Sequence, residues 1–111
     1  MPFALTIAFA LTIPLFDATD IRVRNDSALA LTKVFIGRTN YGDIKSHGVT
    51  EYKPWDKAYS YATVELFADA KPLLAVAIDY FGETPLGEGK FTYVIQIVDG
   101  RISLKCEKDS Q

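Results

Sequence analysis

An Asp99-Gly100 pair lies near the end of the sequence, between two stretches in which apolar residues alternate with more polar ones. The first stretch covers residues 86–98 and the second covers residues 101–107. Asp-Gly between two such stretches is the strongest short-range signal for a β-hairpin, because a type I′ turn needs positive φ at both central residues. This hairpin constrains the fold more than any other feature of the sequence.

The two-residue loop also determines which residues of the two strands face each other. The predicted pairs are Val98–Arg101, Ile97–Ile102, Gln96–Ser103, Ile95–Leu104, Val94–Lys105, Tyr93–Cys106 and Thr92–Glu107. Alternate pairs share a face, so one face is apolar or aromatic and the other is largely polar. A shift by one residue would expose Ile and Leu to water, which makes the register well determined. Cys106 is expected on the apolar face as a small buried hydrophobic residue.

The composition indicates one globular domain. The chain has 111 residues, of which 49% are hydrophobic and 23% charged, and this excludes a disordered chain. The net charge of -2 argues against nucleic-acid binding, which normally needs a basic surface. A single cysteine excludes an internal disulfide and does not identify the redox compartment.

An uncharged apolar run covers residues 3–16. A membrane-spanning helix needs about 20 apolar residues, and this run is shorter, so no transmembrane span is predicted. Its length suits the apolar region of a secretory signal, although no Lys or Arg precedes it and the bulky Phe16 adjoins the expected cleavage site. Apolar residues also alternate along the run, which leaves open a packed strand or a surface helix.

We interpret residues 1–18 as a signal segment, which predicts a secreted or periplasmic location for a domain of residues 20–107. Residues 108–111 are polar and are expected to fray. The domain is predicted to contain about seven short strands and no helix. Besides the hairpin, the expected strands are residues 21–24, 32–36, 49–53, 59–68 and 73–80. Residues 41–48 are expected to form a turn-rich loop.

Individual residues refine these expectations. Asn25-Asp26-Ser27 and Asp69-Ala70-Lys71-Pro72 have the composition of turns. Glu65 marks the outward face of its strand. The next strand is expected to have one bulky face, with mostly Ala on the opposite face; the bulky residues are Leu74, Val76 and Ile78. The number and spacing of the strands predict a single all-β antiparallel sandwich.

The sequence Leu86-x-x-Gly89-x-Phe91-x-Tyr93 resembles the Leu-x-Pro-Gly-x-Tyr-x-Val phrase of prealbumin-like and other immunoglobulin-like sandwiches. Glu88 stands where those proteins have Pro. A wider resemblance, to small bacterial secreted proteins and lipoproteins of unknown function, is carried by residues 23–27, 41–44, 50–52, 58–62 and 78–83. It implies an exported immunoglobulin-like or prealbumin-like sandwich of no known activity. No cysteine lies near residue 18, so a lipid anchor is not supported.

An aromatic stretch provides the candidate ligand or partner surface. Its residues are Tyr52, Trp55, Tyr59 and Tyr61, with Tyr80 and Phe81 in a neighbouring loop. Flat rings beside Asp and Lys suit a sugar or a peptide, since rings supply apolar area and their polar tips supply hydrogen bonds. In the structural alternative, Trp55 closes an open end of the sandwich and the tyrosines cover an edge.

No catalytic, cofactor or metal residue is predicted. His47 is the only histidine, no nucleophile motif accompanies it, and it is expected to be a solvated loop residue. One His and one Cys do not make an ordinary zinc site. Asp79, Glu83 and Glu88 lack the spacing of a calcium loop. The sequence therefore predicts a non-enzymatic binding or structural module for a protein or glycan partner, with carbohydrate binding around Trp55 as the alternative.

Overall fold

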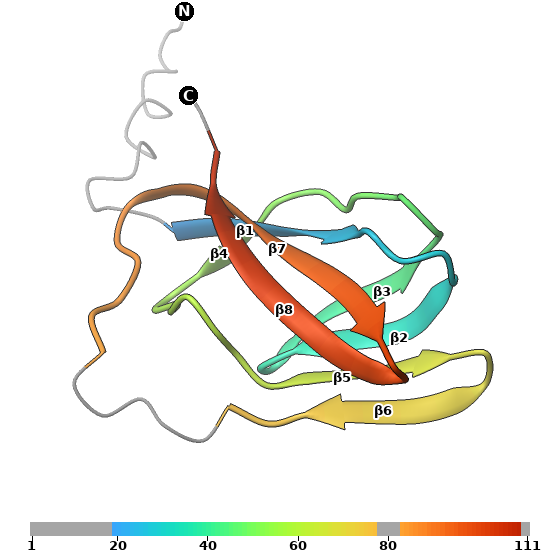
Figure 1. The fold of residues 1–111 in the computed structure, drawn as a ribbon. Helices are drawn as coiled ribbons and strands as arrows, with labels where there is room; N and C mark the ends of the chain where they lie inside the picture. Colours follow the sequence, from blue (N-terminus) through green and yellow to red (C-terminus); the bar gives the residue numbers. More distant parts are fainter. Residues whose placement is uncertain (1–18, 78–82, 110–111) are drawn as a thin grey trace, which may run out of the picture.

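The computed structural model describes residues 19–77 and 83–109, and this part of the chain consists of eight β-strands and their connections (Figure 1). The strands are β1 (Thr19–Asn25), β2 (Leu31–Ile36), β3 (Thr39–Ile44), β4 (Lys53–Trp55), β5 (Val64–Ala68), β6 (Lys71–Ala75), β7 (Gly89–Val98) and β8 (Arg101–Lys108). The prediction of an all-β fold is confirmed, with one strand more than the seven expected. No helix in the described ranges is long and apolar enough to cross a membrane.

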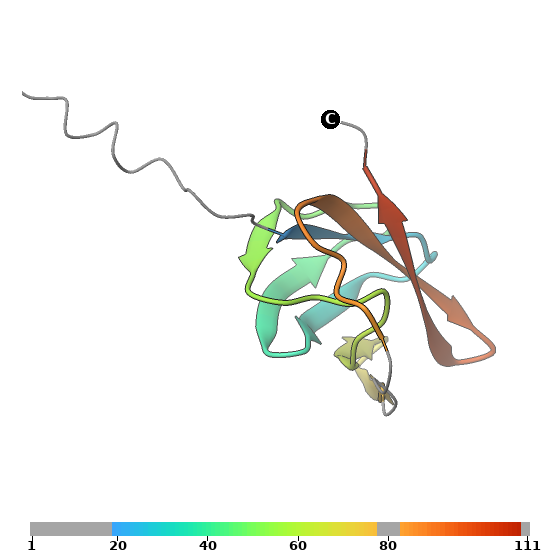
Figure 2. The same cartoon turned by 90° about the vertical axis from the view of Figure 1, so that its left-hand side faces the viewer.

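The strands form two four-stranded sheets, an arrangement compatible with a β-sandwich. Sheet A has the order β4-β1-β7-β8, and sheet B has the order β3-β2-β5-β6. Figure 2 shows the β7–β8 hairpin, in orange and red, on one side of the molecule and the green strands β3 and β4 on the other. The expectation of a purely antiparallel fold is wrong at one pair, because β1 runs parallel to β7. A hydrophobic pattern of period two is the same in both chain directions, so the sequence does not distinguish the two pairings.

The predicted pairing of the hairpin is confirmed. Strands β7 and β8 pair from Phe91–Lys108 to Val98–Arg101, and all seven predicted pairs occur. Asp99 and Gly100 have φ of 53° and 75°, as a turn with two positive φ values requires. Cys106 is half-buried against the core on the predicted face.

The largely polar face of the hairpin is less exposed than predicted. Thr92 and Val94 on this face are buried. The hydroxyl of Thr92 accepts a hydrogen bond from Nε of Arg22 (2.9 Å) and donates one to the Asp109 carboxylate (2.8 Å). A polar layer on the outside of sheet A therefore covers this part of β7.

The core is built from the inward faces of both sheets. Its fully buried residues are Ile21, Val23, Tyr93 and Ile95 from sheet A and Leu31, Val34, Ile36 and Val64 from sheet B. Each such aliphatic side chain contributes about 1.5–3 kcal/mol through burial. The predicted alternation of buried Ile21 and Val23 with partly exposed Arg22 and Arg24 is confirmed.

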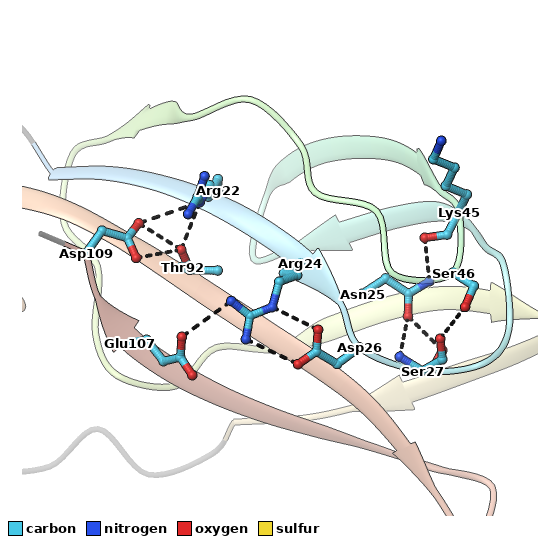
Figure 3. Close-up of polar contacts among 10 residues, drawn as sticks. All are labelled: Arg22, Arg24, Asn25, Asp26, Ser27, Lys45, Ser46, Thr92, Glu107 and Asp109. Atoms are coloured by element: carbon cyan, nitrogen blue, oxygen red, sulfur yellow. Dashed lines mark hydrogen bonds and ion pairs between the residues drawn. The ribbon is translucent and has the colours of Figure 1, made fainter.

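The turn at Asn25 is also confirmed (Figure 3). Asn25 is completely buried, and its Oδ1 accepts hydrogen bonds from the main-chain N–H of Ser27 (2.9 Å) and from the Ser27 hydroxyl (2.7 Å). Its Nδ2 donates to the carbonyls of Leu29, Ile44 and Lys45 at 2.8, 3.0 and 3.1 Å. One amide side chain thus holds together the end of β1, the next loop and the end of β3.

Several strand boundaries differ from the predictions. Residues 41–48 were expected to form a loop, but β3 covers Thr39–Ile44, and Tyr41 and Ile44 are buried. Gly42 at φ 74° lies beside a register shift between β2 and β3, so a bulge explains the turn-like composition. The strand predicted at 49–53 is replaced by β4, an edge strand that accommodates Pro54.

The β5–β6 hairpin differs from its prediction in register. Residues 59–63 lie outside β5, and the turn consists of Asp69 and Ala70 alone, which have φ of 54° and 61°. This short turn places Leu73 opposite Leu66, so Leu73 packs against the core. The bulky side of the predicted strand is not buried, because the Leu74 and Val76 side chains are 61% and 57% exposed. Ile78 lies outside the described residues.

Candidate functional site

Trp55, the central residue of the predicted aromatic surface, packs into the fold. Its indole N–H donates to the Tyr41 hydroxyl at 2.9 Å, and its ring lies edge-on to Tyr93, with the centroids 5.7 Å apart. A Cβ atom at Gly37 would lie 3.4 Å from the indole, so the turn between β2 and β3 also approaches the ring closely. Trp55 thus closes the side of the molecule where the edge strands β4 and β3 meet.

Tyr52 belongs to a different environment, on the outside of sheet A. Its hydroxyl donates to the Asp109 carboxylate, and its ring lies 5.0 Å from Cζ of Arg22 and 4.6 Å from Nζ of Lys90. The hydrogen bond to Asp109 and burial raise the pKa of Tyr52.

The remaining predicted surface residues are also dispersed. Tyr59 is half-buried, and its main-chain carbonyl accepts a hydrogen bond from the Tyr93 hydroxyl. Tyr61 is half-buried on the connection before β5. Tyr80 and Phe81 lie outside the described residues. The structure therefore does not bring Tyr52 and Trp55 together on one aromatic surface.

The charged side chains on the outside of sheet A pair with one another (Figure 3). Arg24 contacts Asp26 at 2.8 Å and Glu107 at 3.5 Å, and Arg22 lies 3.6 Å from Asp109. The hydrogen bond from Arg24 lowers the pKa of Asp26. This surface is a network of internally neutralised charges.

The same network holds the C-terminal end of β8. Lys108 belongs to β8, and Asp109 accepts hydrogen bonds from Tyr52 and Thr92. The main-chain N–H of Asp109 donates to the carbonyl of Lys90 at 2.9 Å. The expectation of a frayed tail is therefore wrong for Lys108 and Asp109, while residues 110–111 lie outside the described part of the chain.

The titratable residues considered for catalysis do not gather into a site. His47 is exposed, with φ of 62°, as expected for a loop residue. Within residues 19–77 and 83–109, no three His, Cys, Asp or Glu side chains lie close enough to hold a metal ion. Burial raises the pKa of the Cys106 thiol to about 11. Glu83 and Glu88 are exposed, and Asp79 lies outside the described residues.

A surface that the sequence analysis did not identify lies on the outside of sheet B. Strand register places Phe35, Glu65 and Leu74 in one row across β2, β5 and β6, and Thr32, Phe67 and Pro72 in the next. A groove of about 350 Å³ follows these rows. It is lined by Lys33, Phe35, Glu65, Leu66, Phe67, Pro72, Leu73 and Leu74. We refer to Lys33, Phe35, Glu65, Phe67, Pro72 and Leu74 together as the sheet B face.

The sheet B face carries one charge of each sign. Lys33 lies at a bulge with φ of 51°, where its main-chain N–H donates to the Asp43 carboxylate at 3.0 Å. Nζ of Lys33 lies 5.6 Å from the centroid of the Phe67 ring. Glu65 lies between Phe35 and Leu74 in the strand register. None of the ion pairs between described residues includes Lys33 or Glu65.

Part of this face is recognisable from the sequence. The outward position of Glu65 places Phe67, two residues later, on the same side of the strand. Leu74 was missed because the bulky side of its strand was not related to the outward face of β5, where Glu65 lies opposite Leu74.

The chain matches no protein-family model, and no curated protein sequence matches it. The resemblance to small bacterial secreted proteins therefore stays a prediction.

Proposed function

We propose that the chain is a non-enzymatic, exported binding module, and that its binding surface is the sheet B face. The observation that carries the proposal is the exposed apolar groove between Phe35 and Leu74, which are 37% and 61% exposed. Exposed apolar patches with polar residues around them mark interaction sites on soluble proteins. The immunoglobulin-like or prealbumin-like character of the sandwich, suggested by residues 86–93, is part of the same proposal.

The chemistry of the face suits a protein partner. Phe35, Phe67, Pro72 and Leu74 provide aromatic and aliphatic contact area on regular strands, which lose little conformational freedom on binding. The two charges supply orientation, as charged groups do at protein interfaces. A partner that presents apolar side chains with complementary charges would match this arrangement.

Carbohydrate binding through Trp55, Tyr59 and Tyr61 receives less support from the geometry. The polar N–H and one ring edge of Trp55 are used in contacts with Tyr41 and Tyr93. These contacts match the structural alternative, in which the indole closes the fold. We therefore place the binding surface on sheet B.

Site-specific photo-cross-linking tests the proposal. A benzophenone amino acid replaces Leu74 in one variant and Val98 in a second, because Val98 is 53% exposed at the hairpin tip and provides a matched control. Irradiation in the native host is expected to give a discrete product from position 74 that position 98 does not give. Leu74→Ser is then expected to weaken binding of the identified partner at least about tenfold, with Val98→Ser unchanged. No product from position 74, or the same products from both positions, would refute the proposal.

A further inference from the structure

The charges of the sheet B face differ in one respect from the paired charges on the outside of sheet A. On sheet A, Arg22 contacts Asp109, and Arg24 contacts Asp26 and Glu107, so these charges are balanced within one chain. Lys33 and Glu65 line the same apolar groove but form no ion pair among the described residues. Any partner that covers the groove must therefore supply one negative and one positive group.

The cost of covering these charges is what selects the partner. A charge removed from water is strongly unfavourable unless an opposite charge or hydrogen bonds replace the water. Glu65 has the apolar Phe35 and Leu74 as its strand-register neighbours, and Lys33 lies over Phe67. A purely apolar partner would leave both charges uncompensated.

We infer that the partner of the sheet B face is a second copy of this chain, bound face to face, with Lys33 of each copy opposite Glu65 of the other. The inference rests on the binding surface proposed above and names its occupant. A two-fold axis that lies in the interface between Lys33 and Glu65 exchanges their positions. Both charges of both copies are then paired in two symmetry-related contacts.

The apolar residues of the face fit the same arrangement. Phe35, Phe67 and Leu74 of one copy would cover the groove of the other, which removes their exposed area from water. Sheets that pack face to face lie about 10 Å apart, a distance that long Lys and Glu side chains extending from both faces can bridge. The ammonium group of Lys33, which lies over the Phe67 ring in one copy, can reach the second copy while the aliphatic stem covers the apolar face.

Charge reversal tests the inference with the full-length protein. Sedimentation equilibrium over a micromolar concentration range is expected to show a wild-type dimer. Lys33→Glu or Glu65→Lys alone places like charges together twice in each dimer, so each is expected to weaken dimerisation at least about tenfold. An equimolar mixture of the two variants is expected to recover the dimer, because every reversed charge then meets an opposite one. This recovery also shows that both variants fold.

The control reverses two exposed charges away from the face. Lys57→Glu and Glu51→Lys are expected to leave the wild-type dimer unchanged. The apolar run of residues 3–16 is present in every variant, so association through it cannot produce a pattern that depends on Lys33 and Glu65. A dimer that persists in both single variants, or a mixture that stays monomeric, would refute the inference.

The outcomes also separate this inference from the proposed function. A monomeric wild-type protein that forms a cross-link from position 74 to a different protein would overturn the second copy as partner and retain the binding surface. A dimer whose cross-link from position 74 joins two copies of this chain supports both proposals. A monomer with no product from position 74 would overturn both.

Discussion

The Tyr41 hydroxyl accepts a hydrogen bond from the Trp55 indole at 2.9 Å and donates one to the main-chain carbonyl of Ile21 at 2.8 Å. Tyr41 belongs to sheet B, whereas Trp55 and Ile21 belong to sheet A. One hydroxyl therefore connects the two sheets beside the edge strands β3 and β4. Burial raises the pKa of Tyr41 to about 12, so the group keeps its proton and can donate at neutral pH.

Tyr41→Phe is expected to lower the free energy of unfolding by about 1–3 kcal/mol, because it leaves the buried partners of the hydroxyl without their hydrogen bonds. Urea unfolding followed by circular dichroism measures the change. Trp55→Phe and the double variant complete a double-mutant cycle. The Tyr41 substitution is expected to cost less in the Trp55→Phe protein, and strictly additive effects would show that the indole–hydroxyl bond contributes nothing.

Asn25→Asp is expected to destabilise the fold by at least about 3 kcal/mol. The substitution keeps the shape of the side chain but replaces an amide that donates to three carbonyls with a group that repels them. Urea unfolding again measures the effect. Asn40→Asp is the matched control, because the Asn40 side chain acts as an acceptor from Gly42 and Asp keeps that role. Equal losses in the two variants would contradict the assigned role of Asn25.

The β7–β8 hairpin was predictable down to individual residue pairs because the turn sequence and the alternation of apolar residues specify the same register. Asp99-Gly100 specifies a two-residue turn, and only one register buries the Ile and Leu residues. The buried alternation of β1 follows from the same reasoning. These features depend on neighbouring residues alone.

The errors occurred where local composition competes with long-range pairing. Gly42 and Asp43 resemble a turn, but pairing of β3 with β2 places them beside a bulge. Asp69 and Ala70 adopt positive φ without glycine, so a turn shorter than expected was not recognisable. The parallel β1–β7 contact joins segments that lie far apart in sequence, and no local signal records its direction.

The dispersal of the predicted aromatic surface has a related reason. Aromatic residues between Tyr52 and Tyr61 suggest a surface, but the fold turns Trp55 inward to contact Tyr41 and Tyr93. Leu74 lies in a run in which every residue is apolar, so the sequence does not show which face of this strand is buried. Its exposure follows from its position opposite Glu65 on β5, a pairing that the composition of this run does not reveal.

Cys106 is expected to react slowly with thiol reagents in the folded protein. Its pKa, raised to about 11 by burial, reduces the thiolate fraction at pH 8 by about a hundredfold relative to a thiol with a pKa of 9. Alkylation rates of the native and urea-unfolded protein at pH 8 measure the difference. A native rate equal to the unfolded rate would show that Cys106 is neither buried nor shifted.

Asp109 is expected to contribute to acid stability. Burial by itself would raise its pKa, but hydrogen bonds from Tyr52 and Thr92 and the charge of Arg22 outweigh burial and lower the pKa. A group with a lowered folded-state pKa contributes stability above its unfolded pKa of about 4, and this contribution is lost as the pH falls through the folded value. Unfolding free energies of the wild type should therefore decline more steeply below about pH 5 than those of Asp109→Asn.

The exposed Asp56→Asn serves as the control for this pH profile. Its profile is expected to follow that of the wild type. If Asp109→Asn shows the same acid decline as the wild type, the interactions with Tyr52 and Thr92 do not stabilise the charged carboxylate. The anchoring of the end of β8 to β1 and β7 would then be energetically unimportant.

The protein recovered from its own host is expected to lack about the first 18 residues and to be found outside the cytoplasm. The reason is the uncharged run of residues 3–16, whose length suits a signal segment. Cleavage before β1, which begins at Thr19, would leave all eight described strands intact. Intact mass of the protein from separated compartments measures the outcome.

Leu11→Asp provides the matched variant, because a charge in the middle of the apolar run opposes recognition as a signal. This variant is expected to keep its full mass and to remain in the cytoplasm. A wild-type protein of full mass in the cytoplasm would contradict export. Residues 3–16 would then function as a strand, a helix or a partner-binding segment of the folded protein, and the alternation of their apolar residues would favour the strand.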